Sequence, residues 1–474
     1  MGRPTVFPTG TTVYSPEKCW SGYTLFTAPG KGVTLIDMNG KAVRWWKDFQ
    51  GFPCKMVPGG KLFGHLGQRD HSAAYQDDTD LTEIDFDGNV LWTFDHNQFV
   101  NDEDSGPRWV ARQHHDFQIE GNPVGYYVPG QDPKDDFNKV LILCHNDVSK
   151  PKVSPQLLVE DALLEIDREG NILWTWNLMD HFREFNLSEA QKNTIFRDPN
   201  TQECGPDGEG DIFHINCASY LGPNKWFDEG DERFNPENII MDSREANIMF
   251  IISHKTGKVV WSIGPDYTVS RELRIMGPII GMHHSHMIPK GLPGEGNIMV
   301  FDNGGWAGYG APSQTSRMGI KSERRDYSRV MEINPKTLKI EWSFSAADLG
   351  WKSPFTSHYF YSPLTSCAQR LPNGNTMITE GTTGRLIEVT AEKELVWEYN
   401  YPDVGPALLY RAYRIPYEWV PQLTKPEEVP VAQLTNATFQ VPGASDPRLS
   451  EDTMVTVEGT KGWGGPGNFC VDKL

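Results

Sequence analysis

Six segments of the chain repeat one pattern, and this repeat constrains the fold more than any other feature of the sequence. Each segment is an alternating apolar run, a short turn and a second alternating run with a tryptophan near its end; they are residues 34–46, 81–94, 163–176, 250–263, 330–344 and 385–399. Alternation with a period of two indicates β-strands, and turns such as Asn39-Gly40 indicate tight hairpins. The tryptophans expected to pack between sheets are Trp92, Trp174, Trp261, Trp342 and Trp397.

A second hairpin follows several of these segments. Its turn has a Pro-Asn-Gly-Asn-like sequence at residues 58–60, 294–297 and 372–375. Two hairpins make a four-stranded sheet that cannot bury both of its faces alone, so six such sheets are expected to stack radially. The sequence therefore predicts an all-β fold, a six-bladed β-propeller with long loops on one face. A parallel α/β fold is excluded because no helical pattern of about 10–15 residues separates the strands.

The repeat also predicts the layout of the chain. We expect a single propeller domain over residues 1–474, with blades from about residue 10 to residue 415. The Pro-rich segment 416–474 is expected to pack on the outside as a C-terminal extension. Long loops are expected at residues 131–160, 181–210, 221–240 and 303–328.

The composition narrows the range of partners. The net charge of −19 disfavours binding to nucleic acid or to anionic membranes. No apolar h-region marks a signal peptide at the N-terminus, so a cytoplasmic location is expected for the sequence as written, and a periplasmic one if a leader was removed. The 7 cysteines are scattered without a Cys-x-x-Cys pair, which favours reduced thiols. A homo-oligomer is left open.

Histidines occur in strand-like segments outside the repeat, where an apolar core residue is expected. These segments are residues 113–122, 211–220, 281–291 and 356–362, with 64–72 as a weaker fifth. Each follows a different repeat hairpin at an equivalent place, and equivalent places in propeller blades face one axis. A single buried histidine is usually a satisfied core residue, but four equivalent positions favour a functional site. The histidines expected to converge are His114, His115, His214, His283, His284, His286 and His358.

The strand and loop pattern predicts that four other polar residues lie on the surface rather than at the axis. His96, His145 and His181 lie in polar stretches and are expected on the surface. Arg244 comes just before an apolar strand, and the pattern alone favours an exposed loop.

Several motifs occur in order along the chain. They are HHDFQ (114–118), DIFHIN (211–216), Ser243-Arg244 before a strand ending in TGKVVWSIG (256–264), HHSHM (283–287) with GNIMVFDNG (296–304), and RLPNGNTMITEGTTGRLIEV (370–389) with VWEY (396–399). This ordered set resembles the bacterial arylsulfotransferase family, the PAPS-independent aryl-sulfate sulfotransferases, over roughly residues 10–415. The resemblance implies a six-bladed propeller enzyme that transfers a sulfuryl group from an aryl sulfate donor to a phenolic acceptor.

The resemblance also implies roles for individual residues. His284 takes the position of the nucleophile that is transiently sulfated, while His115 and His214 match the two histidines that hold the sulfuryl oxygens. Arg244 matches the sulfate-binding arginine, which moves it from a loop to the pocket. The choice of His284 over His283, and of His115 over His114, depends on the offset to the neighbouring motifs. The further residues expected to contact substrate are His114, His283, His286, His358 and Tyr359.

This chemistry is consistent with the residue types. Sulfuryl transfer, like phosphoryl transfer, builds charge on equatorial oxygens and on the leaving group. A neutral imidazole can attack without first losing a proton, and each pre-placed donor contributes on the order of 3 kcal/mol. A route through a sulfohistidine predicts ping-pong kinetics on small aromatic substrates, with no metal and no cofactor.

Two other functions remain open from the sequence. Several imidazoles around one axis also suit a transition metal, so a metal-dependent oxygenase, hydrolase or lyase is the alternative. The third hypothesis is a non-enzymatic propeller that binds a ligand or a protein through its loops.

Overall fold

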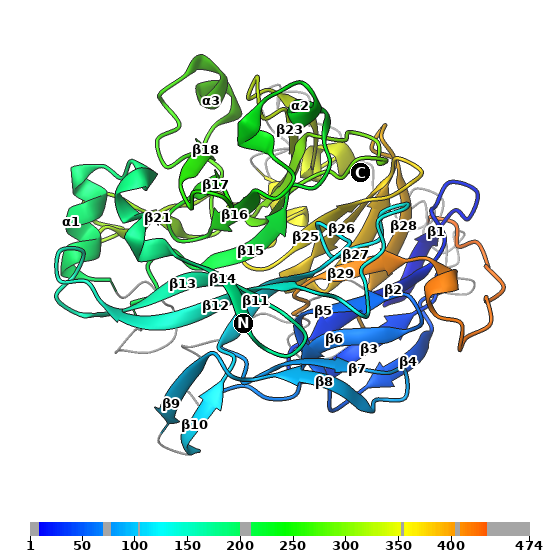
Figure 1. Cartoon of the computed structure of the whole chain (residues 1–474). Coiled ribbons are helices and arrows are strands. Elements are labelled where there is room, and N and C mark those ends of the chain that lie inside the picture. The colour runs from blue at the N-terminus through cyan, green and yellow to red at the C-terminus, as the bar shows by residue number, and fades with distance from the viewer. Residues whose placement is uncertain are drawn as a thin grey trace, which may run out of the picture.

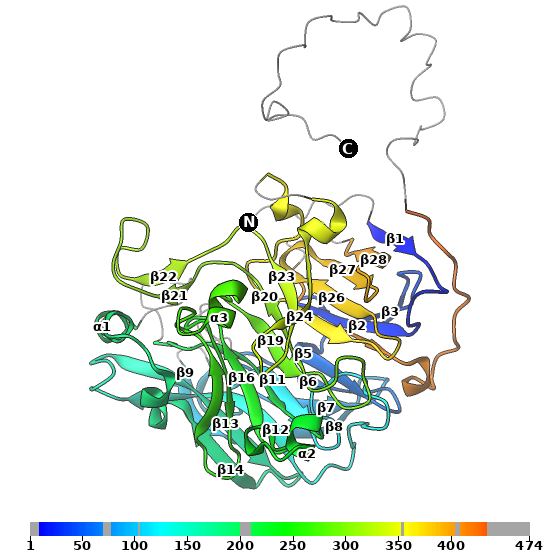
Figure 2. The same cartoon turned by 90° about the horizontal axis from the view of Figure 1, so that it is seen from above.

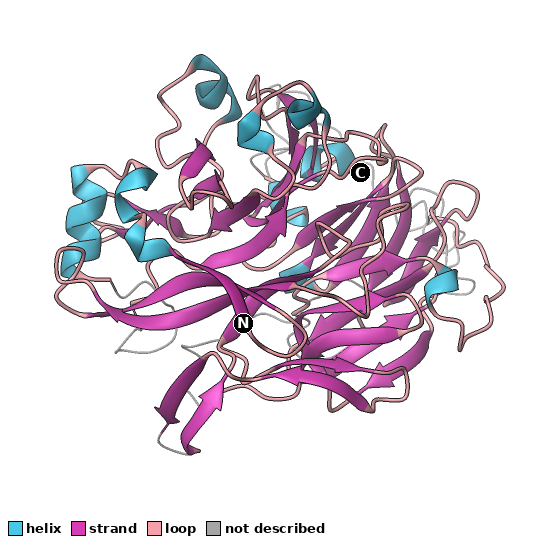
Figure 3. Ribbon diagram, viewed as in Figure 1, coloured by secondary structure: helices cyan, strands magenta, loops and turns pink. Residues whose placement is uncertain are grey.

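The computed structural model describes residues 9–69, 77–102, 105–199, 210–351, 355–402 and 408–433. Within them, antiparallel strands form six large sheets that radiate from a common axis (Figures 1 and 2). Strands dominate, and the helices lie in the connections between strands (Figure 3). The six-bladed all-β propeller expected from the repeat is confirmed.

The blades are numbered in chain order, and the strands of each blade are given from the one nearest the propeller axis to the outermost one. Blade 1 contains β29 (Ala412–Ile415), β2 (Tyr23–Ala28), β3 (Gly32–Ile36) and β4 (Ala42–Trp46). Blade 2 contains β5 (Gln50–Val57), β6 (Lys61–His65), β7 (Leu81–Ile84) and β8 (Val90–Phe94). Blade 3 contains β11 (Gln113–Ile119), β12 (Val140–Ser149), β13 (Leu157–Ile166) and β14 (Ile172–Asn177).

The second half of the ring follows the same order. Blade 4 contains β15 (Ile215–Tyr220), β16 (Ile239–Ser243), β17 (Ile248–Ile252) and β18 (Val259–Ile263). Blade 5 contains β19 (His283–Met287), β20 (Ile298–Asp302), β23 (Arg329–Ile333) and β24 (Ile340–Ser345). Blade 6 contains β25 (Cys367–Arg370), β26 (Thr376–Glu380), β27 (Arg385–Val389) and β28 (Leu395–Asn400), with β1 (Gly10–Tyr14) as a fifth, outer strand.

Smaller elements decorate the ring. Two hairpins project from it, β9 (Gln98–Asp102) with β10 (Gly106–Val110), and β21 (Ala307–Tyr309) with β22 (Ile320–Glu323). The helices are α1 (Glu189–Arg197), α2 (Lys225–Asp228) and α3 (Arg271–Met276), and the 3₁₀ turns are η1 (Leu178–Asp180), η2 (Phe182–Phe185), η3 (Glu232–Phe234), η4 (Ala346–Leu349), η5 (Ser357–Tyr359), η6 (Gly381–Thr383) and η7 (Tyr417–Trp419). None of the helices in the described ranges is long and apolar enough to cross a membrane.

Both ends of the chain close the ring. Strand β29, from the C-terminal part of the chain, is the inner strand of blade 1 and pairs with β2 from the N-terminal part. Strand β1 pairs with β28 on the outside of blade 6. The first and last blades therefore share strands through hydrogen bonds, which removes the open edges that a six-sheet array would otherwise expose.

A ring of tryptophans joins each blade to the next. In every blade the outermost repeat strand carries a tryptophan whose indole N–H donates to a backbone carbonyl in a hairpin turn of the following blade. The six bonds are Trp46 to Phe86, Trp92 to Arg168, Trp176 to Gly257, Trp261 to Pro335, Trp342 to Ala391 and Trp397 to Met38, all between 2.7 and 2.9 Å. Blade 3 uses Trp176 rather than Trp174, which stacks on His254.

Not all of the expected loops are loops. Segment 131–160 contains β12 and the start of β13, which are strands of 10 residues each. The connection from β14 to β15, described over residues 178–199 and 210–214, and the connection over residues 303–328 lie at the end of the propeller where the inner strands begin. Segment 221–240 connects β15 to β16, at the opposite end, so the expectation that all long insertions share one face is wrong. The physical reason is that successive connections in an antiparallel sheet alternate between its two ends.

The chain after the last blade runs along the outside of the ring. Tyr14 and Val431 exchange backbone hydrogen bonds of 2.8 and 2.9 Å, and the ring of Tyr417 packs edge-on against Tyr23. Residues 434–474 lie outside the described residues. The described cysteines, Cys19, Cys54, Cys144, Cys217 and Cys367, are free thiols, and Cys204 and Cys470 lie outside the described ranges.

A histidine with positive φ lies in or next to the inner strand of three blades. His115, His214 and His284 have φ angles of 53°, 51° and 56°. The strand register shifts across His115 and across His284, and in β15 it shifts between Ile215 and Cys217, just after His214. A side chain other than glycine adopts positive φ rarely, and such residues gather at functional sites. Because a bulge interrupts the alternation of side chains, residues on its two sides face different surroundings.

We expect Trp397→Phe to destabilise the protein by about 1–3 kcal/mol, because the buried Met38 carbonyl loses its donor between the last and the first blade. Thermal and guanidinium unfolding measure the change. The control is Trp109→Phe, whose indole is 47% exposed on the β9–β10 hairpin. Equal stability of the two variants would contradict the role of the tryptophan ring.

Candidate active site

Imidazoles from neighbouring blades meet where the inner strands begin. The ring centroids of His115, on β11, and His214, just before β15, are 4.7 Å apart. His114 lies next to His115, with 2.8 Å between their Nδ1 atoms. The structure therefore brings histidines from blades 3 and 4 into contact near the axis, as the blade-equivalence argument expects.

His283 belongs to this cluster. It interacts electrostatically with His115, His214 and Arg244. Its Nδ1 is 2.7 Å from Oδ1 of Asn303 and 3.1 Å from the Gly281 carbonyl. Both partners accept hydrogen bonds, so Nδ1 carries the proton and Nε2 keeps its lone pair. Burial first, and then the charge of Arg244, hold the pKa of His283 well below its usual range.

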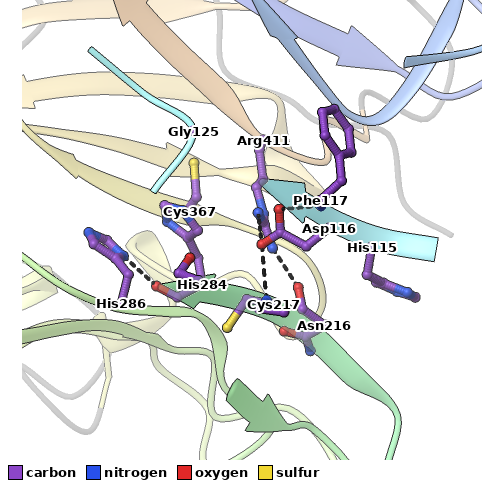
Figure 4. A network of polar contacts seen from close by, with 12 residues as sticks. His115, Asp116, Phe117, Gly125, Asn216, Cys217, His284, His286, Cys367 and Arg411 are labelled. Atoms are coloured by element: carbon purple, nitrogen blue, oxygen red, sulfur yellow. Dashed lines mark hydrogen bonds and ion pairs between the residues drawn. The ribbon is translucent and has the colours of Figure 1, made fainter. Parts of the chain in front are cut away.

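His284 lies on the other side of the bulge. Its Nδ1 is 3.1 Å from the Ala368 carbonyl, and its ring centroid is 4.5 Å from that of His286. Burial, followed by the charge of Arg411, lowers the pKa of His284. In Figure 4 the ring of His115 projects away from Arg411, while His284 and His286 lie on the opposite side of that guanidinium. The two adjacent histidines of β19 thus have different neighbours.

A buried ionic network fills the axis beside the histidines (Figure 4). Asp116 accepts from Lys55 at 2.6 Å and from Arg411 at 3.0 Å, and all three side chains are buried. Burial alone would raise the pKa of Asp116, but the two cations lower it. Burial lowers the pKa of Lys55 to about 8, against the opposing effect of Asp116. Asp242, a second buried carboxylate, also interacts electrostatically with Arg411, so the two cations face two carboxylates.

Arg244 is buried rather than exposed. It follows β16, its backbone N–H donates to the His214 carbonyl at 3.2 Å, and its side chain pairs with Glu245. Nη2 donates to the Trp306 carbonyl at 3.3 Å. In the part of the chain that the structure describes, its buried Nε has no hydrogen-bond partner. The exposed position favoured by the pattern alone is therefore wrong, whereas the sulfate-binding role implied by the family resemblance stays a prediction.

Two expected substrate contacts lie elsewhere. His358 and Tyr359, in η5, are exposed and stack on each other, and Tyr359 stacks on Trp351. They do not join the histidine cluster, because η5 lies on the surface, where Tyr359 packs against Trp351. His286 is buried in the axis and contacts Tyr126 at 3.0 Å, so it does not face the cluster of His115 either.

Sequence reasoning missed several residues of the site. His145, expected on the surface, lies on β12 and is 1% exposed. Its ring stacks on that of His114, with 3.6 Å between the ring centroids. Asn303, which holds His283, lies just after β20, and only the pairing of that strand with β19 reveals the contact. The ring centroid of Phe52 is 4.6 Å from that of His115 and 3.7 Å from that of Tyr410, on which Phe52 stacks. A cavity of about 230 Å³ adjoins Phe52.

Comparison with known proteins gives one decisive match. A model of the arylsulfotransferase (ASST) family matches residues 132–404, more than half of the 474 residues. The chain belongs to the arylsulfotransferase family. Membership in this family makes the protein an arylsulfotransferase-like transferase at the level of reaction class. His214, Arg244 and His283 lie within the matched segment, whereas His114 and His115 precede it.

Other comparisons add little. No curated protein matches the sequence. Among solved structures, a protein of unknown function from Bacteroides caccae is 12% identical, with 84% of this chain and 99% of that chain covered and a TM-score of 0.43. A streptogramin B lyase is 11% identical, with 85% and 86% covered and a TM-score of 0.36. A virginiamycin B lyase from Staphylococcus aureus is 11% identical, with 83% and 85% covered and a TM-score of 0.35. The similarities are remote, so the fold assignment rests on the strand pairing.

The buried histidines make stability depend on pH. Burial lowers the pKa of His286 to about 4, against about 6.5 in an unfolded chain. The unfolded state therefore binds a proton first, and stability falls as the pH drops below about 6.5. We expect His286→Gln to remove about 2 kcal/mol of the stability difference between pH 7.5 and pH 5, measured by guanidinium unfolding. His96→Gln, at an exposed histidine, should leave the difference unchanged.

Proposed function

We propose that the protein transfers a sulfuryl group from an aryl sulfate to a phenolic acceptor through a sulfated histidine, and that this histidine is His283. The observation that supports this most directly is the Asn303 contact, which leaves a lone pair on Nε2 of a neutral imidazole that lies within electrostatic range of Arg244 and His214. A neutral imidazole is a competent nucleophile and needs no base to activate it.

The two steps of the proposed reaction use the same groups. Nε2 of His283 attacks sulfur, the bond between sulfur and the aryl oxygen breaks, and the phenolate leaves. The acceptor oxygen then attacks the sulfohistidine, the sulfur–nitrogen bond breaks, and the acceptor proton passes to water. The Asn303 carbonyl stabilises the Nδ1–H of the sulfated ring throughout.

The charge of the transferred group needs donors that are already in place. Arg244 offers a guanidinium with an unpartnered buried Nε in the described part of the chain, and His115 and His214 lie next to it in the cluster. His214 donates its Nδ1–H to Asp211 at 2.6 Å, which fixes the orientation of the ring. Donors held in this way stabilise developing charge without reorganising during the reaction.

We therefore propose His283 as the nucleophile, one residue before His284, which the offset to the neighbouring motifs predicts. His284 is also neutral, but its neighbours are His286, Lys55 and Arg411 rather than the Arg244 cluster. The family match covers both residues and does not choose between them.

The aromatic parts of the substrates have candidate contacts at the same end of the propeller. Trp306 is 38% exposed and its carbonyl holds Arg244. Tyr361 is half-buried and lies within electrostatic range of Arg244. On the other side of the cluster, Phe52 borders the cavity described above. Aromatic rings of this kind favour stacking with a phenolic ring.

We expect His283→Ala to reduce acceptor-dependent release of 4-nitrophenol from 4-nitrophenyl sulfate by about 10³-fold or more, because the nucleophile is lost. His284→Gln is the matched variant on the same strand, and it should retain activity within about tenfold. An active His283→Ala protein together with an inactive, folded His284→Gln protein would reverse the assignment.

We expect parallel double-reciprocal plots for donor and acceptor, as a ping-pong route requires. Intersecting plots would contradict the covalent intermediate.

Because the pKa of His283 is lowered, protonation of this ring should reduce kcat/KM for the donor only below about pH 6.5. Initial rates from pH 5 to pH 9 measure this dependence. A fall in kcat/KM that begins above pH 6.5 would contradict a neutral His283.

A further inference from the structure

Blade 3 holds a second group of side chains that the proposed sulfuryl transfer does not use directly. His114 on β11, His145 on β12 and Asp161 on β13 are each at most 1% exposed, and one ligand atom from each lies within 4.8 Å of the others. Nε2 of His114 is 3.6 Å from Oδ1 of Asp161, and Nε2 of His145 is 3.9 Å from the same oxygen. These distances are too long for hydrogen bonds.

The two imidazoles turn lone pairs toward the carboxylate. Nδ1 of His145 is 2.6 Å from Oδ1 of Asp77, so this nitrogen donates and Nε2 of the neutral ring carries a lone pair. Nδ1 of His114 contacts Nδ1 of His115 at 2.8 Å. Within the described ranges, Nε2 of His114 and Nε2 of His145 are buried and have no hydrogen-bond partner. An imidazole nitrogen with a free lone pair is a common ligand of transition metals.

The charges nearby favour a cation. Oδ1 of Asp161 and Oδ2 of Asp211 both lie 3.9 Å from Nε2 of His145, so two buried carboxylates face the same point. Among the described residues, the ion-pair partners of Asp161 are histidines, with no lysine or arginine. A bound cation would relieve the repulsion between the two carboxylates and would give both imidazoles a partner.

We propose that His114, His145 and Asp161 bind a divalent transition metal ion of the zinc type. Two imidazoles and one carboxylate are ligands that Zn²⁺ accepts, and tetrahedral bonds of about 2.1 Å place ligand atoms about 3.4 Å apart, close to the 3.6 and 3.9 Å observed. Asp77 supports the site as the carboxylate that holds the far nitrogen of His145, an arrangement common around metal-bound histidine. The rings of His114 and His145 are nearly parallel, at 16°, so binding requires them to splay apart at their Nε2 edges.

The metal would act on the sulfuryl site by positioning. A metal on Nε2 of His114 requires its Nδ1 to carry the proton and to donate to Nδ1 of His115. His115 then carries its own proton on Nε2, as a donor for a sulfuryl oxygen needs. This role rests on the proposed function, whereas the binding of the metal does not.

The test uses the full chain, dialysed against a chelator and titrated with Zn²⁺ alone. Calorimetry should show one equivalent bound, the melting temperature should rise, and Co²⁺ in place of Zn²⁺ should give the visible absorption of a tetrahedral site. Asp161→Asn, which keeps an acceptor for the Ile215 N–H, and His145→Gln should weaken binding by more than the about 10–100-fold expected for the outer Asp77→Asn.

His181→Gln is the control, since this imidazole stacks on Trp176 in a different part of blade 3. It should bind Zn²⁺ as the unaltered chain does. Absence of stoichiometric binding, or equal binding by the His145→Gln and Asp161→Asn proteins, would overturn the site. The metal-free melting temperature of each variant shows whether it folds.

The positioning role has its own readout. In ¹⁵N-histidine spectra, the signal lost in His115→Gln should show the Nε2–H tautomer when Zn²⁺ is bound. An Nδ1–H tautomer of His115 in the zinc form would overturn the positioning role while leaving the metal site in place. A protein that binds Zn²⁺ but shows no sulfuryl transfer would instead overturn the proposed function alone.

Discussion

The ring of indole hydrogen bonds from each blade to the next is the constraint on which the rest of the structure depends. Each bond joins an outer strand to a turn in the following blade, and the bond from Trp397 to Met38 joins the last blade to the first. Strand β29 closes the same gap on the inside, through its pairing with β2. With both closures in place, the six inner strands are held at one radius. Only then do residues as distant in sequence as His115 and His283 become neighbours.

The inner strands store strain at the site that this closure creates. Each positive φ at a non-glycine residue costs on the order of 1–3 kcal/mol, and three of them occur at histidines of adjacent blades. The bulges separate two sets of side chains: a cluster with Arg244, suited to an anion, and an axial set around Arg411 and Asp116. The axial set is a buried, paired ionic network of Lys55, Asp116 and Arg411.

Blade 3 connects the proposed metal site with the proposed sulfuryl-transfer site. A chain of contacts runs from Asp77 through His145 and His114 to His115, so the cation proposed at His114 would set the proton on His115, the ring proposed to hold a sulfuryl oxygen. The proton position on one imidazole determines that of the next, because a neutral ring has one donor and one acceptor.

The sequence by itself determined the six blades, since period-two alternation and repeated turns are local properties that do not depend on distant contacts. It also located the segments that line the site, because equivalent blade positions face one axis. Which of two adjacent histidines faces Arg244 was decided only in three dimensions: the bulge at His284 breaks the alternation from which a side chain's direction is inferred. His145 looked like a surface residue because its stretch is polar, yet β12 extends to Ser149 and pairs His145 with Asp161 in the interior. His358 showed the opposite error, since a histidine-bearing segment at the expected spacing turned into the exposed η5 instead of a strand. Sequence periodicity gives the path of a strand, but the register, the bulges and the charges from neighbouring blades settle where each polar side chain finds its partner.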